Sequence, residues 1–67
     1  MRGTIKKLLS DKRFGFIRGT DDVERFFHES GLDSGTSWML LREGDAVEFR
    51  EVPGQKGPRA IEVKVIA

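Results

Sequence analysis

Residues that favour turns interrupt this chain about every ten residues. They gather at Ser10-Asp11-Lys12, Gly19-Thr20-Asp21-Asp22, Arg42-Glu43-Gly44-Asp45 and Pro53-Gly54-Gln55-Lys56-Gly57-Pro58. Between these turns, several short stretches alternate apolar and polar residues, which is typical of β-strands and leaves little room for helices. We therefore predict strands over residues 3–9, 13–18, 23–28, 47–50 and 61–65.

Five short strands favour a small barrel, because closing the sheet pairs its two edge strands. At 67 residues the chain can form one domain, residues 1–67, of a size at which a stable core is just possible. Alternation breaks at Lys7-Leu8-Leu9, which indicates a bulge in the first strand. Residues 29–41 are rich in Gly, Ser and Thr and predict a long loop with one helical turn near residues 30–33. The predicted fold class is all-β, a small five-stranded antiparallel β-barrel.

The second predicted strand carries two phenylalanines on one face. Alternation puts Phe14 and Phe16 on the same side as Lys12 and Arg18, with Ile17 on the opposite side. If the rings faced the core, Ile17 would face water and the two charged residues would share the buried side. We therefore predict that Ile17 points inward and that the two rings lie on the surface among basic residues.

The third predicted strand adds Phe26 and His28 to this surface and turns Phe27 inward. A group of exposed rings with basic neighbours suits single-stranded nucleic acid, because each base offers a π-face and each nucleotide brings a phosphate. The formal net charge is only +1, but the first half of the chain is basic, with Arg2, Lys6, Lys7, Lys12, Arg13, Arg18 and Arg25. The pattern predicts a surface that binds single-stranded RNA, DNA or both.

The composition excludes several other classes of function. There is no cysteine and only one histidine, which excludes disulfides, thiolate catalysis and zinc fingers, and no metal site is expected. The longest apolar run, residues 38–41, is far shorter than the roughly 20 residues that span a bilayer. His28 has no serine or carboxylate placed to complete a catalytic group, so we do not predict an enzyme. We expect no cofactor, no membrane or small-molecule partner, a monomer and a location in the reducing cytoplasm.

Several short motifs together cover the chain from end to end. They are Gly3-Thr4-Ile5-Lys6, Asp11-Lys12, Phe14-Gly15-Phe16-Ile17, Phe26 with His28 and Ser30, Glu43-Gly44-Asp45-Ala46-Val47-Glu48-Phe49, and Gly54-Gln55-Lys56-Gly57-Pro58 with Ala60. Through these motifs the chain resembles the bacterial cold-shock proteins. The resemblance implies an OB-fold and binding of single-stranded RNA and DNA with little sequence preference, in the manner of an RNA chaperone.

By this resemblance, the ligand face contains Lys6, Lys12, Phe14, Phe16, Phe26, His28 and Trp38. Trp38 falls where the family has a loop phenylalanine, although the residues alone leave two roles open for it, a plug over the end of the barrel or a base-stacking ring. Lys7 and Arg18 complete the predicted site as further phosphate contacts.

The chain departs from the family pattern at five positions. Lys7 stands in place of a surface Trp, Leu9 of an Asn, Arg13 of a Gly, Arg25 of a buried Val and Glu29 of a Phe. Two stacking rings are missing and one acidic group is added, which predicts weaker binding that depends more strongly on salt. The alternative hypothesis is a protein-interaction barrel that uses Leu9, Trp38 and Met39 as an apolar patch.

Overall fold

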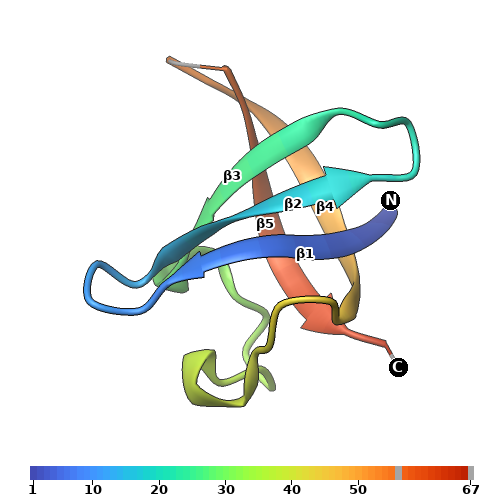
Figure 1. Ribbon diagram of the computed structural model, residues 1–67. Helices are drawn as coiled ribbons and strands as arrows, with labels where there is room; N and C mark the ends of the chain where they lie inside the picture. The colour runs from blue at the N-terminus through green and yellow to red at the C-terminus, as the bar shows by residue number, and fades with distance from the viewer. Residues whose placement is uncertain (56, 67) are drawn as a thin grey trace.

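The computed structural model describes residues 1–55 and 57–66 and shows a closed barrel of five strands (Figure 1). The strands are β1 (Arg2–Leu9), β2 (Phe14–Gly19), β3 (Glu24–His28), β4 (Ala46–Gly54) and β5 (Gly57–Val65). Two 3-10 helices, η1 (Glu29–Gly31) and η2 (Trp38–Leu40), lie in the connection between β3 and β4. The predicted fold class, an all-β barrel of the OB-fold type, is confirmed. No helix in the described part of the chain is long and apolar enough to cross a membrane.

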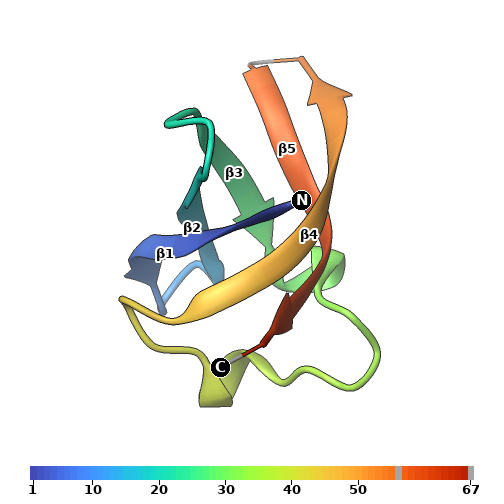
Figure 2. The ribbon, with the colours of Figure 1, turned by 90° about the vertical axis from the view of Figure 1, so that its right-hand side faces the viewer.

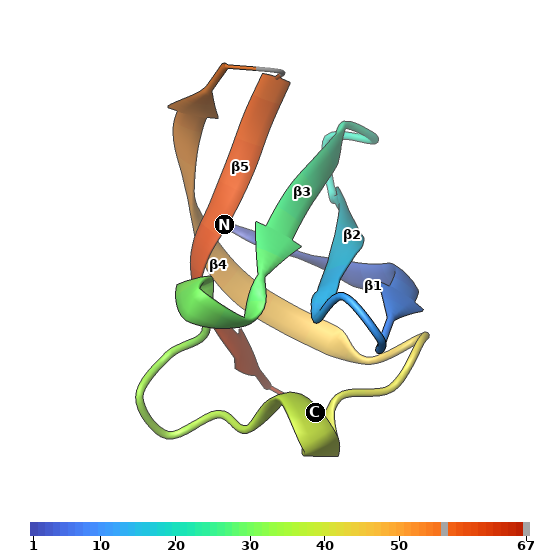
Figure 3. The same cartoon turned by 90° about the vertical axis from the view of Figure 1, so that its left-hand side faces the viewer.

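The strands follow the order β1-β2-β3-β5-β4 around the barrel, and β4 pairs with β1 to close it (Figure 2). Four of the neighbouring pairs are antiparallel, as predicted. The pairing of β3 with β5 is parallel, with Phe26 opposite Arg59, and the prediction of a wholly antiparallel barrel was wrong here (Figure 3). The reason is the long connection after β3, which lets the β4–β5 hairpin return with β5 running in the direction of β3.

The β4–β5 hairpin is longer than predicted. Alternation indicated strands only over residues 47–50 and 61–65, with a flexible loop at residues 53–58. In the structure, Pro53 pairs with Pro58 and Gly54 with Gly57, so most of that loop belongs to the two strands. Lys56, also part of the predicted loop and of its motif, lies outside the described residues.

A bulge in β1 decides which of its side chains reach the surface. Ile5 lies opposite Ile17, but the next partners are Lys7 and Phe16, so one extra residue is inserted at Lys6. An extra residue reverses the alternation of inward and outward side chains. Ile5 and Leu8 therefore both pack toward the core, while Lys7 is exposed beside Phe16. The predicted bulge is confirmed, one residue earlier than expected.

The core receives side chains from all five strands and from the β3–β4 connection. Its buried members are Ile5, Ile17, Phe27, Trp38, Leu41, Val47, Phe49, Ala60 and Val63. Gly15 is needed for this packing, because a Cβ there would lie 2.9 Å from the Phe27 ring. The inward orientation predicted for Ile17 and Phe27 is confirmed, and both side chains are fully buried.

Arg25 occupies a buried position, as the resemblance implied, but as a charged residue with partners. Its guanidinium donates to both carboxylate oxygens of Asp21, at 2.6 and 2.9 Å, to the Val23 carbonyl at 3.1 Å and to the Glu51 carboxylate. It also lies over the Phe49 ring, 5.5 Å from the ring centroid. The hydrogen bonds from Arg25 hold the pKa of the Asp21 carboxyl well below its usual range. The buried charge of Arg25 is thus paired with carboxylates. A protein core accommodates a buried charge when it is paired and hydrogen-bonded in this way.

Candidate nucleic-acid interface

Three phenylalanine rings lie together on the outer face of β2 and β3. Phe14 and Phe16 come from β2, and Phe26 lies opposite Phe16 on β3. The ring centroids of Phe14 and Phe26 are 5.2 Å apart, and each lies 6.1 Å from that of Phe16. All three side chains are partly exposed to solvent. The prediction that these rings share one surface, opposite Ile17, is confirmed.

His28 extends this group of rings at the end of β3. It lies opposite Phe14 in the ladder and is also partly exposed. Its Nδ1 accepts a hydrogen bond from the backbone N–H of Ser30 at 3.1 Å, which caps η1 and fixes the ring. In the neutral ring the proton then lies on Nε2. We call Phe14, Phe16, Phe26 and His28 the aromatic strip.

The predicted lysines are exposed, and the β1–β2 ladder places one of them beside the aromatic strip. Lys6, Lys7 and Lys12 are all exposed, and Lys7 lies directly opposite Phe16. Arg18, at the far end of β2, is exposed too, but its Nη2 lies 3.4 Å from a carboxylate oxygen of Glu24 on β3. A phosphate that binds Arg18 must therefore compete with that carboxylate. None of the three lysines forms an ion pair with any residue that the structure describes.

Arg59 is a basic residue of this surface that the sequence analysis missed. Its guanidinium lies over the Phe26 ring, 5.6 Å from the centroid, and the side chain is exposed. The contact arises from the parallel pairing of β3 and β5, which places Arg59 opposite Phe26. Local alternation carries no signal for this pairing, because it joins strands separated by the long connection. Arg59 extends the basic border of the aromatic strip onto β5.

Trp38 does not lie on the aromatic strip. It is only 7% exposed and packs against Phe27, with 5.9 Å between the ring centroids. Of its two predicted roles, the structure shows the plug over the end of the barrel; the exposed position implied by the resemblance is wrong. The reason is that the β3–β4 connection folds back under the barrel (Figure 1). The indole is buried there with Leu41.

Trp38 also helps to line a pocket at this end of the barrel. The pocket has a volume of about 320 Å³ and is lined by Leu8, Ser10, Arg13, Trp38, Met39 and Leu41. We call it the end pocket. Its lining mixes apolar and polar groups and is open to solvent, and Arg13 provides its one charged side chain.

Two of the departures from the family pattern form an ion pair. The Arg13 Nη1 donates to a carboxylate oxygen of Glu29 at 2.8 Å, and the Glu29 backbone N–H donates to the Arg13 carbonyl at 2.9 Å. The carboxylate of Glu29 is therefore compensated by a neighbouring cation. The expected repulsion between Glu29 and phosphate is smaller than the sequence alone indicated.

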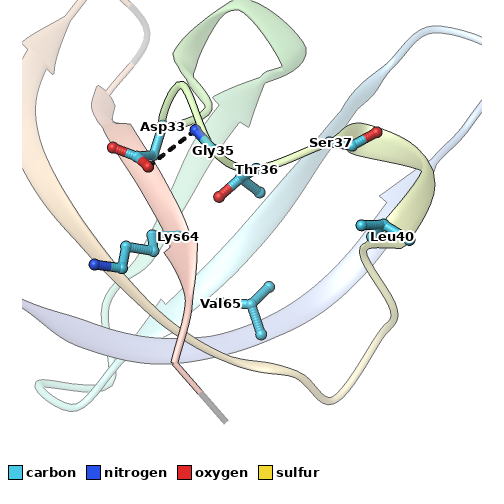
Figure 4. A pocket seen from close by; sticks show the side chains of 7 residues that line it. All are labelled: Asp33, Gly35, Thr36, Ser37, Leu40, Lys64 and Val65. Carbon is cyan, nitrogen blue, oxygen red and sulfur yellow. Dashed lines mark hydrogen bonds between the residues drawn. The ribbon is translucent and has the colours of Figure 1, made fainter.

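A second hollow, of about 390 Å³, lies between the β3–β4 connection and β5 (Figure 4). Its lining includes Asp33, whose carboxylate accepts a hydrogen bond from the backbone N–H of Gly35 at 3.2 Å. None of its seven lining residues is aromatic, so it offers no stacking surface. Within residues 1–55 and 57–66, no three His, Asp or Glu side chains gather as a metal ion would require.

Comparisons with known proteins show the family of this chain. The model of the 'Cold-shock' DNA-binding domain matches residues 1–66. The cold shock-like protein CspLB of Listeria monocytogenes is 48% identical over 63 residues, which is 91% of each chain. A cold shock-like protein of Thermotoga maritima is 39% identical over 66 residues, 98% of each chain, and the cold shock protein CspA of Staphylococcus aureus is 39% identical over 62 residues, 92% of each chain. The chain therefore belongs to the cold-shock domain family, a family of nucleic-acid-binding domains.

Proposed function

We propose that this protein binds single-stranded RNA or DNA along the aromatic strip, with little preference for sequence along its length. The observation that carries the proposal is the cluster of three partly exposed phenylalanine rings, with the exposed Lys7 opposite Phe16 and the Arg59 guanidinium over Phe26. Stacking of a base on an aromatic side chain is worth about 1–3 kcal/mol and tolerates any base, because every base has a π-face. A double helix hides those faces, so the strip favours single strands.

The residues divide into two roles. Phe14, Phe16, Phe26 and His28 stack on bases, while phosphates are contacted by Lys6, Lys7, Lys12, Arg18 and Arg59. Binding makes no covalent bond, so the protein acts only by covering the bases that it binds. A base held on the strip is withheld from pairing, and we propose that the protein thereby keeps transcripts unpaired, as an RNA chaperone does.

The alternative of a protein-interaction barrel is less well supported. It relied on Leu9, Trp38 and Met39 as an apolar patch, and Trp38 is buried in the core. Met39 and Leu40 of η2 remain exposed, at 83% and 74%. Two adjacent side chains are a small apolar area, and single exposed apolar residues are common on protein surfaces.

The test is a titration of labelled hexathymidine, hexauridine and a duplex of matched length, at two salt concentrations. We expect both single strands to bind, the duplex to bind much more weakly, and the affinity to fall as salt rises. The variant Phe16→Ala should retain its fold and lose affinity, with Arg50→Ala as a matched control outside the strip. Equal affinity for duplex and single strands would contradict the proposal.

A further inference from the structure

The end pocket begins where the aromatic strip ends. Arg13 directly precedes Phe14, and Leu8 and Ser10 flank Leu9, which lies opposite Phe14 in the ladder. A strand that stacks its bases along β2 can therefore continue past Phe14 toward this pocket. A volume of about 320 Å³ is at the lower end of the range for small-ligand sites. The lining combines apolar side chains with Ser10 and Arg13, which suits the flat face and the polar edge of a single base.

The charged side chain of the end pocket has hydrogen-bond donors to offer. A guanidinium carries five N–H donors in a planar fork. Among the residues that the structure describes, the Arg13 guanidinium has one side-chain partner, the Glu29 carboxylate, through Nη1. The contact orients the guanidinium and leaves its other donors for a ligand, and half of the Arg13 side chain (52%) is exposed.

The backbone at Arg13 has a conformation that is energetically unfavourable for a residue with a side chain. Its φ is 57°, in the left-handed region that glycine adopts freely and that other residues rarely occupy. Such an outlier supports a hypothesis of function when a specific role is available for the side chain. A glycine would satisfy the backbone here but would supply neither charge nor donors.

We propose that the end pocket binds one guanine base and that Arg13 recognises it. Guanine presents two neighbouring acceptors, O6 and N7, which match a pair of donors on a guanidinium. Adenine replaces one of these acceptors with a donor, and thymine offers O4 beside a methyl group. The proposal rests on the function proposed above and adds to it a single base preference at one end of a strip that otherwise tolerates any sequence.

The test compares heptamers that differ in one terminal base. Each carries six thymidines and, at either the 5′ or the 3′ end, a thymidine, an adenosine, a guanosine or a 7-deazaguanosine, which lacks the N7 acceptor. We expect one of the two guanosine heptamers to bind roughly fivefold or more tightly than the all-thymidine heptamer. We expect 7-deazaguanosine at the same end to lose most of that gain. The emission of Trp38, the protein's only tryptophan, should change more with the guanosine heptamer, because Trp38 lines the pocket.

The variant Arg13→Lys keeps the charge and removes the planar fork, so it should abolish the preference for guanosine. The matched control is Arg50→Lys, another exposed arginine in an ion pair, with Glu62 at 3.1 Å, on β4 and away from the strip. This control should keep both the affinity and the preference. The comparison of the heptamers on the unaltered protein needs no mutation, so it decides the matter even if a variant fails to fold.

Three results would overturn the proposal. Equal affinity for guanosine and thymidine at both ends would exclude a guanine site, while binding of the all-thymidine heptamer would leave the proposed function intact. A preference that survives in Arg13→Lys would exclude Arg13 as the group that recognises guanine. Failure to bind any of the heptamers would reject the proposed function and, with it, this inference.

Discussion

Phe26 and Phe27 are neighbours in β3 and have opposite environments. Phe27 is fully buried between Trp38 and the space left by Gly15, while Phe26 is partly exposed and lies beside two surface rings and a guanidinium. The same type of residue thus belongs to the core on one face of the strand and to the aromatic strip on the other. Stability explains the first position, whereas the second fits the function proposed above, in which bases stack on the rings.

The largest expected effect is on the core. Phe27→Ala should destabilise the protein by about 3–5 kcal/mol, because it leaves a cavity among fully buried side chains. In a domain this small, such a loss can exceed the whole free energy of unfolding. Thermal unfolding followed by circular dichroism measures the effect, and Phe26→Ala is the matched control. A folded Phe27→Ala protein with impaired nucleic-acid binding would reverse the assignment of the two faces.

The next effect is on the aromatic strip. Phe16→Ala should weaken the binding of a single strand by about 1–3 kcal/mol, the usual loss for one base stack, and leave thermal stability nearly unchanged. Fluorescence anisotropy with a labelled oligonucleotide measures the affinity, and thermal unfolding of the same sample checks the fold. If Phe16→Ala instead loses stability and binds as before, Phe16 is a core residue.

Lys7→Trp should change both affinity and salt dependence. Lys7 lies opposite Phe16, where it can contact a phosphate but offers no stacking plane. For single strands each neutralised phosphate contributes about −0.7 to the slope of log affinity against log salt, so the slope should become shallower by about that amount. The new ring adds stacking, so affinity at physiological salt should rise. Titrations over a range of salt decide the matter, and an unchanged slope without a gain in affinity would place Lys7 off the nucleic-acid path.

The smallest expected effect concerns the acid dependence of stability that the ion pair of buried Arg25 with Asp21 causes. Arg25 lowers the pKa of the Asp21 carboxyl, so the folded protein keeps Asp21 ionised at pH values where the unfolded chain takes up a proton. The resulting stabilisation is complete above about pH 4, the ordinary pKa of Asp, and is lost as the pH falls further toward the lowered pKa. Asp21→Asn should remove part of this acid dependence. Unfolding midpoints of both proteins between pH 7 and pH 2 test this, and identical curves would contradict it.

Period-two alternation predicted much of this molecule correctly because it depends on neighbouring residues only. It placed Phe14 and Phe16 on one face, Ile17 on the other and Phe27 in the core, all as the structure shows. Alternation alone predicted a barrel without specifying the order of its strands. The resemblance to the cold-shock proteins added the OB-fold.

The features that were missed all depend on long-range geometry. Arg59 reaches Phe26 only through the parallel pairing of β3 and β5. Trp38 is buried because a loop folds back under the barrel, and a loop has no periodicity from which burial can be predicted. The ion pair of Arg13 and Glu29 joins the residue before β2 to the residue after β3. The two departures from the family pattern are therefore explained together, by a contact that sequence alone does not show.

The parallel pairing of β3 and β5 has a consequence for how the barrel should respond to the proposed ligand. Phe26 lies on β3 and Arg59 on β5. A nucleotide that stacks on the Phe26 ring and contacts the Arg59 guanidinium would therefore connect the two strands. A ligand that binds only the closed form stabilises that form by a free energy that grows with the logarithm of the ligand concentration over its dissociation constant. Amide hydrogen exchange in β3 and β5 should therefore slow when a single strand is bound, because separation of these two strands then requires release of the nucleic acid.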